Sequence, residues 1–340
     1  MSVERPEPVQ AAAVFPLSPD QRGEPVRDLQ RRLLGAGYVM GTLEPGVYCS
    51  ETVVALSRFQ EARGLRPTGV CDEHTWLALV EASWKLGDRL LSLSAPNLRG
   101  DDVAELQAAL ARIGFDPGRA DGIFGPTTAR ALEDFQHNSG LYVDGVCGID
   151  TVRALQVLAR QTGSGPGVSV VRELATLTSS ARSLADLRIV VGQFGGLSGL
   201  TRQLVQALRH RSATVIASDE PDAASQAAAA NRFAASVYIG FEAQSGGATR
   251  AHYFAVPEFE SAGGRTLAEL VAEHTARTAP ALKPTVQGMR LTVLRETRMP
   301  AVLVVLGSLA EALDQTPVLV AAVVTALERW ADRPFGDLHA

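Results

Sequence analysis

The sequence has 340 residues, of which 46% are hydrophobic and 20% charged, and its formal net charge at pH 7 is −5. A chain of this length predicts two or three domains, each with its own hydrophobic core. Acidic and basic residues are mixed along the chain, and the absence of a basic block argues against nucleic-acid binding. No apolar run is long enough to span a bilayer, so we expect no stable membrane insertion.

Residues 1–22 are predicted to be a disordered N-terminus. Met1–Gln21 mixes charged residues with prolines and lacks the apolar run of a secretory signal. The three cysteines, Cys49, Cys71 and Cys147, are an odd number without a CxxC pair, which predicts small reduced thiols rather than a disulfide framework. Both features predict a cytoplasmic protein.

Residues 23–86 and 98–160 are predicted to be two copies of one module, because matching features recur at an offset of about 76 residues. The matches include Gly37-Tyr38 with Gly114-Phe115, Phe59-Gln60 with Phe135-Gln136, and Gly69-Val70-Cys71 with Gly145-Val146-Cys147. Apolar residues at helical spacing, ended by glycines, predict three helices in each copy. The expected helices are Val26–Leu34, Glu51–Arg63 and Asp72–Leu79, then Val103–Ile113, Pro126–Asn138 and Asp150–Leu155. The carboxylates of Asp72 and Asp150 are expected to cap the third helix of each copy.

A leucine-glutamine pair in the first helix, a D-G-x-[FY]-G-x-x-T turn and a later F-Q pair mark these copies. This pattern resembles the PGBD-like peptidoglycan-binding module, and the resemblance implies binding of peptidoglycan fragments or precursors. The second copy keeps more of the pattern, since the first has Leu43-Glu44-Pro45-Gly46 where the turn would carry aspartate. The candidate ligand-binding residues are therefore Asp121, Gly122, Phe124, Gln136, Asp144 and Gly145. For the glutamines, hydrogen bonding to nearby turns is the competing interpretation.

Residues 161–186 are predicted to be a linker, with a flexible Gly/Ser/Pro hinge at 161–167 and a helix over Val168–Leu184. In residues 187–332 strands and helices alternate, which predicts an α/β domain, and residues 333–340 form a tail. Strands are expected at Leu187–Gly192, Ala213–Ala217, Ser236–Phe241, Ala251–Val256, Leu291–Leu294 and Ala301–Leu306. Helices are expected at Ser198–Arg211, Pro221–Phe233, Thr266–Thr278 and Thr316–Trp330.

Three windows of the second half, Arg188–Gly196, Val237–Gln244 and Pro300–Gly307, carry a further resemblance. In order and spacing they are similar to the metal and catalytic segments of the zinc-dependent N-acetylmuramoyl-L-alanine amidases of the amidase-3 family. In that family the first two segments supply zinc-binding histidines and the third a catalytic glutamate. The two histidine positions are Phe194 and Glu242 here, and the glutamate position is Val305.

A catalytic zinc needs three protein ligands and a nearby general base. Phe194 cannot bind a metal, Val305 cannot take a proton, and Glu242 supplies one ligand at most. We therefore expect no metal site, no catalytic residue and no cofactor, as in a pseudoenzyme. The alternative, an active zinc amidase that cleaves between muramic acid and L-alanine, rests on the resemblance of the frame alone. The glycines near Ser198 match neither a dinucleotide fingerprint nor a nucleophile elbow.

The predicted fold class is multidomain α and α/β: two three-helix peptidoglycan-binding-like modules followed by an α/β amidase-3-like domain. This order resembles a CwlM-like family of actinobacterial proteins, with Gly100–Gln107, Asp144–Gly148 and Leu294–Val302 as the most specific segments. The resemblance implies a cytoplasmic regulator of cell-wall synthesis, with UDP-GlcNAc enolpyruvyl transferase as a partner. A wall-binding protein outside the cytoplasm is the remaining alternative.

Overall fold

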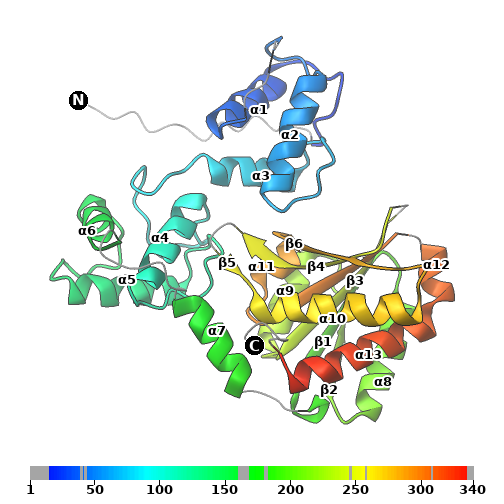
Figure 1. Ribbon diagram of the computed structural model, residues 1–340. Coiled ribbons are helices and arrows are strands. Elements are labelled where there is room, and N and C mark those ends of the chain that lie inside the picture. The colour runs from blue at the N-terminus through cyan, green and yellow to red at the C-terminus, as the bar shows by residue number, and fades with distance from the viewer. Residues whose placement is uncertain are drawn as a thin grey trace. The chain divides into compact units, whose positions relative to one another are not determined.

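The computed structural model describes residues 15–38, 41, 44–159, 168–179, 183–244, 247–256, 259–307 and 309–334. The chain divides into two compact units, Met1–Lys85 and Leu86–Ala340, shown in Figure 1. No helix in the described ranges has the length and apolar character that a membrane span requires. The hinge expected at 161–167 and most of the expected tail lie outside these ranges.

The first unit contains α1 (Glu24–Gly35), α2 (Ser50–Ala62) and α3 (Glu73–Ala82). Their apolar faces meet in one core, whose centre includes Leu29, Leu56 and Phe59. Helix α3 begins as its sequence predicts, because the side chain of Asp72 accepts a hydrogen bond from the backbone N–H of Thr75 at 2.7 Å.

Part of the segment predicted to be a disordered N-terminus is ordered. Leu17 is 5% exposed and forms an antiparallel bridge with Cys71, in which each backbone N–H donates to the other residue's carbonyl at 2.9 Å. The prediction was wrong for residues 15–22, because a buried leucine with paired backbone groups holds the chain against the helices. Residues 1–14 lie outside the described ranges.

The second unit begins with the same arrangement, formed by α4 (Asp101–Arg112), α5 (Pro126–Asn138) and α6 (Ile149–Ala159). Leu91 pairs with Cys147 in the way that Leu17 pairs with Cys71, so the second repeat starts before the predicted residue 98. Asp150, expected as the cap of α6, lies inside the first turn of that helix. We refer to these two three-helix bodies as repeat 1 and repeat 2.

The remainder of the second unit is an α/β layered domain. Its strands are β1 (Arg188–Phe194), β2 (Thr214–Ser218), β3 (Val237–Ala243), β4 (Arg250–Val256), β5 (Phe259–Glu260), β6 (Thr285–Met289) and β7 (Ala301–Leu306). Strands β2, β1, β3 and β7 lie side by side and parallel. Strand β4 runs antiparallel to β7, and both β5 and β6 pair with β4. The central strands are buried apolar runs, as expected for a sheet covered on both faces.

Helices cover both faces of this sheet (Figure 1). On one face α8 (Ser198–His210), α10 (Ala262–Thr278) and α13 (Thr316–Asp332) enclose the larger core, and α10 packs along α13. On the other face lie α9 (Ala223–Arg232) and α11 (Thr292–Glu296). Short elements, η1 (Leu184–Asp186) and α12 (Leu309–Asp314), complete the domain.

Two predictions in the second half were wrong. Leu291–Leu294 is not a strand: Leu291 precedes α11, which buries Val293 and Leu294, and the strand of this region is β6. A short apolar run cannot distinguish a strand from a buried helical turn. The predicted linker contains α7 (Val168–Ser179), whose Leu177 is 4% exposed and belongs to the larger core. That helix is therefore part of the folded unit.

Candidate functional site

The three positions that the amidase family uses for chemistry lie in one row across the sheet. Phe194 is in register with Glu242 between β1 and β3, and Glu242 is in register with Val305 between β3 and β7. Residues in register on neighbouring strands point to the same face of a sheet. The three positions, which are far apart in the sequence, therefore lie at one place in space, near the carboxyl ends of three parallel strands.

The side chains in this row do not fit a zinc ion. Phe194 has no donor atom, and Val305 is an aliphatic residue that is 1% exposed. Glu242 is the one potential ligand among the three, whereas a catalytic zinc has three protein ligands. In the described part of the chain no group of three His, Cys, Asp or Glu side chains could hold a metal ion. The row keeps the strand positions that the amidase family uses but not the side chains that bind zinc.

In the two repeats, four glutamines make the same set of hydrogen bonds. Each is at most 3% exposed, receives a hydrogen bond from the N–H of a turn glycine and donates to a turn carbonyl. The pairs of glycine N–H and carbonyl are Gly46 and Val47 for Gln30, Gly69 and Val70 for Gln60, Gly122 and Ile123 for Gln107, and Gly145 and Val146 for Gln136. We call this arrangement the glutamine clamp.

The residues predicted to bind ligand in repeat 2 fall into two separate clamps and the core. Gln107 donates to Oδ1 of Asp121 at 3.1 Å and accepts from Gly122. Gln136 donates to Oδ1 of Asp144 at 2.8 Å and accepts from Gly145 at 3.0 Å. Phe124 is completely buried among apolar side chains. The clamp explains why these residue types occur, so their role as ligand contacts stays a prediction.

The two clamp aspartates differ in their electrostatics. Removal from solvent raises the pKa of Asp121, although hydrogen bonds from Ile123 and Gln107 and the charges of Arg295 and Arg119 oppose the shift. Asp144 is exposed, and hydrogen bonds from the Val146 backbone and the Gln136 amide lower its pKa. Of the two turns, the one containing Asp121 is the less exposed, because Asp121 is partly buried.

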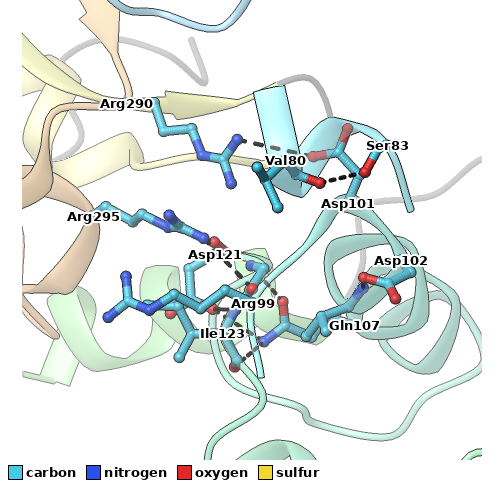
Figure 2. A network of polar contacts seen from close by, with 12 residues as sticks. Val80, Ser83, Arg99, Asp101, Asp102, Gln107, Asp121, Ile123, Arg290 and Arg295 are labelled. Atoms are coloured by element: carbon cyan, nitrogen blue, oxygen red, sulfur yellow. Dashed lines mark hydrogen bonds and ion pairs between the residues drawn. The ribbon is translucent and has the colours of Figure 1, made fainter. Parts of the chain in front are cut away.

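Repeat 2 docks on the α/β domain at the turn that contains Asp121, and Figure 2 shows Arg295 beside Asp121 and Arg290 beside Asp101. Arg295 is 8% exposed, and its Nε donates to the backbone carbonyl of Asp121 at 2.8 Å. Arg290, also 8% exposed, lies with its Nη1 3.9 Å from Oδ1 of Asp101. Both arginines come from the segment that follows β6, so the α/β domain supplies cations to the backbone and first helical turn of repeat 2.

Repeat 2 supplies two cations in return. The guanidinium of Arg119 lies 4.4 Å from the ring centroid of Phe254 and 5.4 Å from that of Phe259, and Nη1 donates to the carbonyl of Thr297. Arg99 of repeat 2 pairs with Glu296, with Nη2 2.8 Å from Oε1. Ala120 completes the contact by packing into the smaller core of the α/β domain.

This docking region lies at the opposite end of the sheet from the amidase row. Strand β4 is antiparallel to β7, and Tyr253 is in register with Val302 near the start of β7. Phe254, which contacts Arg119, is therefore near the amino end of β7, whereas Val305 is near its carboxyl end. Sequence analysis missed the docking arginines, because arginines that bind backbone carbonyls leave no periodic pattern.

Comparisons with known proteins agree with this architecture. Residues 22–79 and 99–155 match the peptidoglycan binding domain family PG_binding_1. The N-acetylmuramoyl-L-alanine amidase CwlM of Mycobacterium tuberculosis is 33% identical over 293 residues, which cover 77% of this chain and 72% of that protein. The amidase CwlL of Bacillus licheniformis is 31% identical over 159 residues, 41% of this chain and 44% of that protein.

Among solved structures, the N-acetylmuramoyl-L-alanine amidase AmiC2 of Nostoc punctiforme is similar over 43% of this chain and 98% of its own length. The identity is 15% and the TM-score is 0.36. At that TM-score the similarity adds nothing to the relationship that the sequences establish.

Proposed function

Because this chain belongs to the family of the N-acetylmuramoyl-L-alanine amidase CwlM, and two of its segments match the peptidoglycan binding domain family, we infer that its role concerns peptidoglycan. We propose that within this role it is a non-catalytic pseudo-amidase. It binds peptidoglycan fragments or precursors and regulates cell-wall synthesis in the cytoplasm. We propose a precursor-forming enzyme, UDP-GlcNAc enolpyruvyl transferase, as its partner.

The observation that carries the proposal is the row of Phe194, Glu242 and Val305 across β1, β3 and β7. Hydrolysis of an amide needs an activated water and a group that accepts its proton. Two of the three side chains in the row have neither a lone pair for a metal nor a titratable proton. The domain retains the sheet on which the family builds its chemistry, and a retained sheet suits recognition of a ligand or partner.

The cysteines support the cytoplasmic location. Cys71 and Cys147 are free thiols, at most 1% exposed, and burial raises the pKa of each to about 12. Buried protonated thiols are slow to react, and a chain without structural disulfides is typical of a reducing compartment.

The test is a rate measurement. The purified chain is titrated into the enolpyruvyl transferase of the same cell, and co-sedimentation with insoluble peptidoglycan is measured in parallel. We expect the rate of the transferase to change and to level off near an equimolar ratio. The variant Gln107→Leu breaks the clamp of repeat 2. If the change in the transferase rate depends on that repeat, this variant should reduce it. An unchanged rate, together with firm binding to the sacculi, would contradict regulation and favour a wall-binding protein.

The M. tuberculosis relative is named an amidase, and this favours a second candidate, zinc-dependent amidase activity. It would require Glu242 to find two further ligands. Zinc content after reconstitution of metal-free protein separates the candidates: we expect no stoichiometric zinc, and one ion per chain would favour the amidase.

A further inference from the structure

The junction between repeat 2 and the α/β domain contains a cavity of about 310 Å³. Repeat 2 lines one side with its Asp121 turn and the segment around Pro117 and Arg119. The α/β domain lines the other side with Asn231 and the residues that end α11. Ligand sites in proteins begin at about this volume, which suits a monosaccharide or a dipeptide.

The charged residues that line this junction cavity are mostly cationic. Four arginines line it, Arg99, Arg119, Arg295 and Arg298, against two acids, Asp121 and Glu296. Both acids already have partners. Oδ1 of Asp121 accepts from Gln107 at 3.1 Å and from the Ile123 N–H at 2.9 Å, and Glu296 pairs with Arg99. The cavity therefore has an excess of positive charge.

One donor in this lining has no acceptor. Nη2 of Arg119 is buried and, within the described ranges, makes no hydrogen bond. The charges of Glu173 and Asp121 act on this guanidinium. Oε1 of Glu173 accepts from Ser261 at 2.7 Å, and its Oε2 is also buried without a hydrogen bond within the described ranges. A buried guanidinium donor without an acceptor costs free energy, which a negatively charged group brought close to it recovers.

The wall of the α/β domain is held in place. Asn231 on α9 donates to the carbonyl of Glu296 at 2.8 Å and accepts from the backbone N–H of Arg298 at 2.9 Å. These two bonds fix the backbone that carries Arg298, whose side chain is exposed. Because this backbone is already fixed, an incoming acid at the rim of the cavity has to order only the side chain of Arg298.

We propose that the junction cavity binds a small acid, with a carboxylate or a phosphate group, of monosaccharide or dipeptide size. The acid is held by Arg298 at the rim and approaches Arg119. Because repeat 2 and the α/β domain both line the cavity, the bound acid stabilises their contact. The proposal does not depend on the proposed function, since it concerns charge and shape at the junction and neither the amidase row nor any protein partner.

Isothermal titration of the full chain tests this with three probes that share one sugar: N-acetylmuramic acid, N-acetylglucosamine 1-phosphate and neutral N-acetylglucosamine. We expect at least one of the two acids to bind and the neutral sugar not to bind. Binding of the first acid alone assigns a carboxylate, binding of the second alone a phosphate, and both results support the site. Failure of both acids to bind at about millimolar concentration overturns it.

Two matched variants locate the binding. Arg298→Gln removes an exposed cation of the cavity. It should lower the affinity for the acid about ten-fold, the usual loss for one charged hydrogen bond. Arg130→Gln removes an exposed arginine of repeat 2 that is outside the lining, and affinity should not change. Equal affinities for the wild type and Arg298→Gln would overturn the proposal, as would an equal loss in both variants.

Hydrogen exchange measures the predicted effect on the junction. With saturating acid, the backbone amides of residues 117–128 and 292–299 should exchange more slowly than without it. The exchange rates of repeat 1, measured in the same sample, should stay unchanged. Slower exchange near the carboxyl ends of β1 and β3, without a change at the junction, would place the acid elsewhere and contradict the proposal.

Discussion

Repeat 1 and repeat 2 have the same internal construction but different surroundings at one turn. Gln30 clamps Gly46 in repeat 1 as Gln107 clamps Gly122 in repeat 2, and both glycines have positive φ, 80° and 73°. In repeat 2 the α/β domain adds Arg295, which donates to the backbone of the turn. In repeat 1 the nearby Arg27 is half-exposed and pairs with Glu24 in its own helix.

The difference shows that the clamp specifies the fold of a repeat and not what its turn contacts. The clamp uses buried amide and backbone groups, so a change of partner outside leaves it intact. What distinguishes repeat 2 is a segment much later in the chain, whose Arg295 lies 174 residues after Asp121 and donates to its carbonyl. Four predictions distinguish the glutamine clamp, which both repeats share, from the contacts that the α/β domain adds to repeat 2. They begin with the largest expected effect.

Removing the clamp should have a large and equal effect in the two repeats. Gln30→Leu and Gln107→Leu keep the buried volume but leave a glycine N–H and a carbonyl without partners, at a cost of about 4 kcal/mol in each repeat. Hydrogen exchange of core amides in the intact chain measures this loss repeat by repeat. A loss confined to repeat 2 would show that the clamp is not the shared support.

Adding a methyl group at the turn should distinguish the repeats. Gly46→Ala costs about 1–2 kcal/mol for its positive φ, and its Cβ would lie 3.2 Å from the Gly23 carbonyl oxygen. Gly122→Ala should cost about 3 kcal/mol, because its Cβ would lie closer to the matching carbonyl oxygen, 2.9 Å from that of Gly100, and in addition 3.3 Å from Nη2 of Arg295. Exchange protection of each repeat is again the measurement, and equal losses would contradict a docked turn.

Removing the cations should affect only the docked turn. Arg295→Ala leaves the Asp121 carbonyl without its buried charged donor and should cost the second unit about 2 kcal/mol. Arg27→Ala breaks an exposed pair and should cost at most about 0.5 kcal/mol. Urea-induced unfolding, followed by hydrogen exchange, measures both changes in the free energy of unfolding. A small effect of Arg295→Ala would mean that repeat 2 is held mainly by Ala120 and the aromatic contacts of Arg119.

The smallest expected effect is on pH dependence, and it has opposite signs at the two clamp aspartates. The lowered pKa of Asp144 contributes stability above its unfolded pKa of about 3.9, and this is lost as pH falls through the folded value. The raised pKa of Asp121 favours the fold below about pH 3.9, and that contribution is lost as pH rises through the folded value.

The substitutions Asp144→Asn and Asp121→Asn keep an acceptor oxygen and remove the titration. Relative to the wild type, Asp144→Asn should therefore be less sensitive to acid, and Asp121→Asn should lose less stability as pH rises above about 4. Exchange rates corrected for their intrinsic pH dependence provide the test. Shifts of the same sign in both variants would contradict the different solvation of the two turns.

Sequence patterns predicted most of the fold because the relevant signals are local. The internal repeat was seen again as two three-helix bodies, and Asp72 caps α3 as expected. The apolar runs predicted to be strands correspond to β1, β3 and β7. The strand predicted at Leu291–Leu294 failed because four apolar residues fit either a strand or α11. The docking of repeat 2 was not predictable, since it depends on arginines that meet backbone carbonyls far away in sequence.

The central claim is that the amidase frame is present without hydrolysis. The most direct test is incubation of metal-free, zinc-reconstituted protein with a soluble muropeptide, with detection of the free amine of L-alanine, and with an active zinc amidase as the positive control. We predict no release above the buffer blank, for the wild type and for Glu242→Gln alike. Release by the wild type that is lost in Glu242→Gln would contradict it.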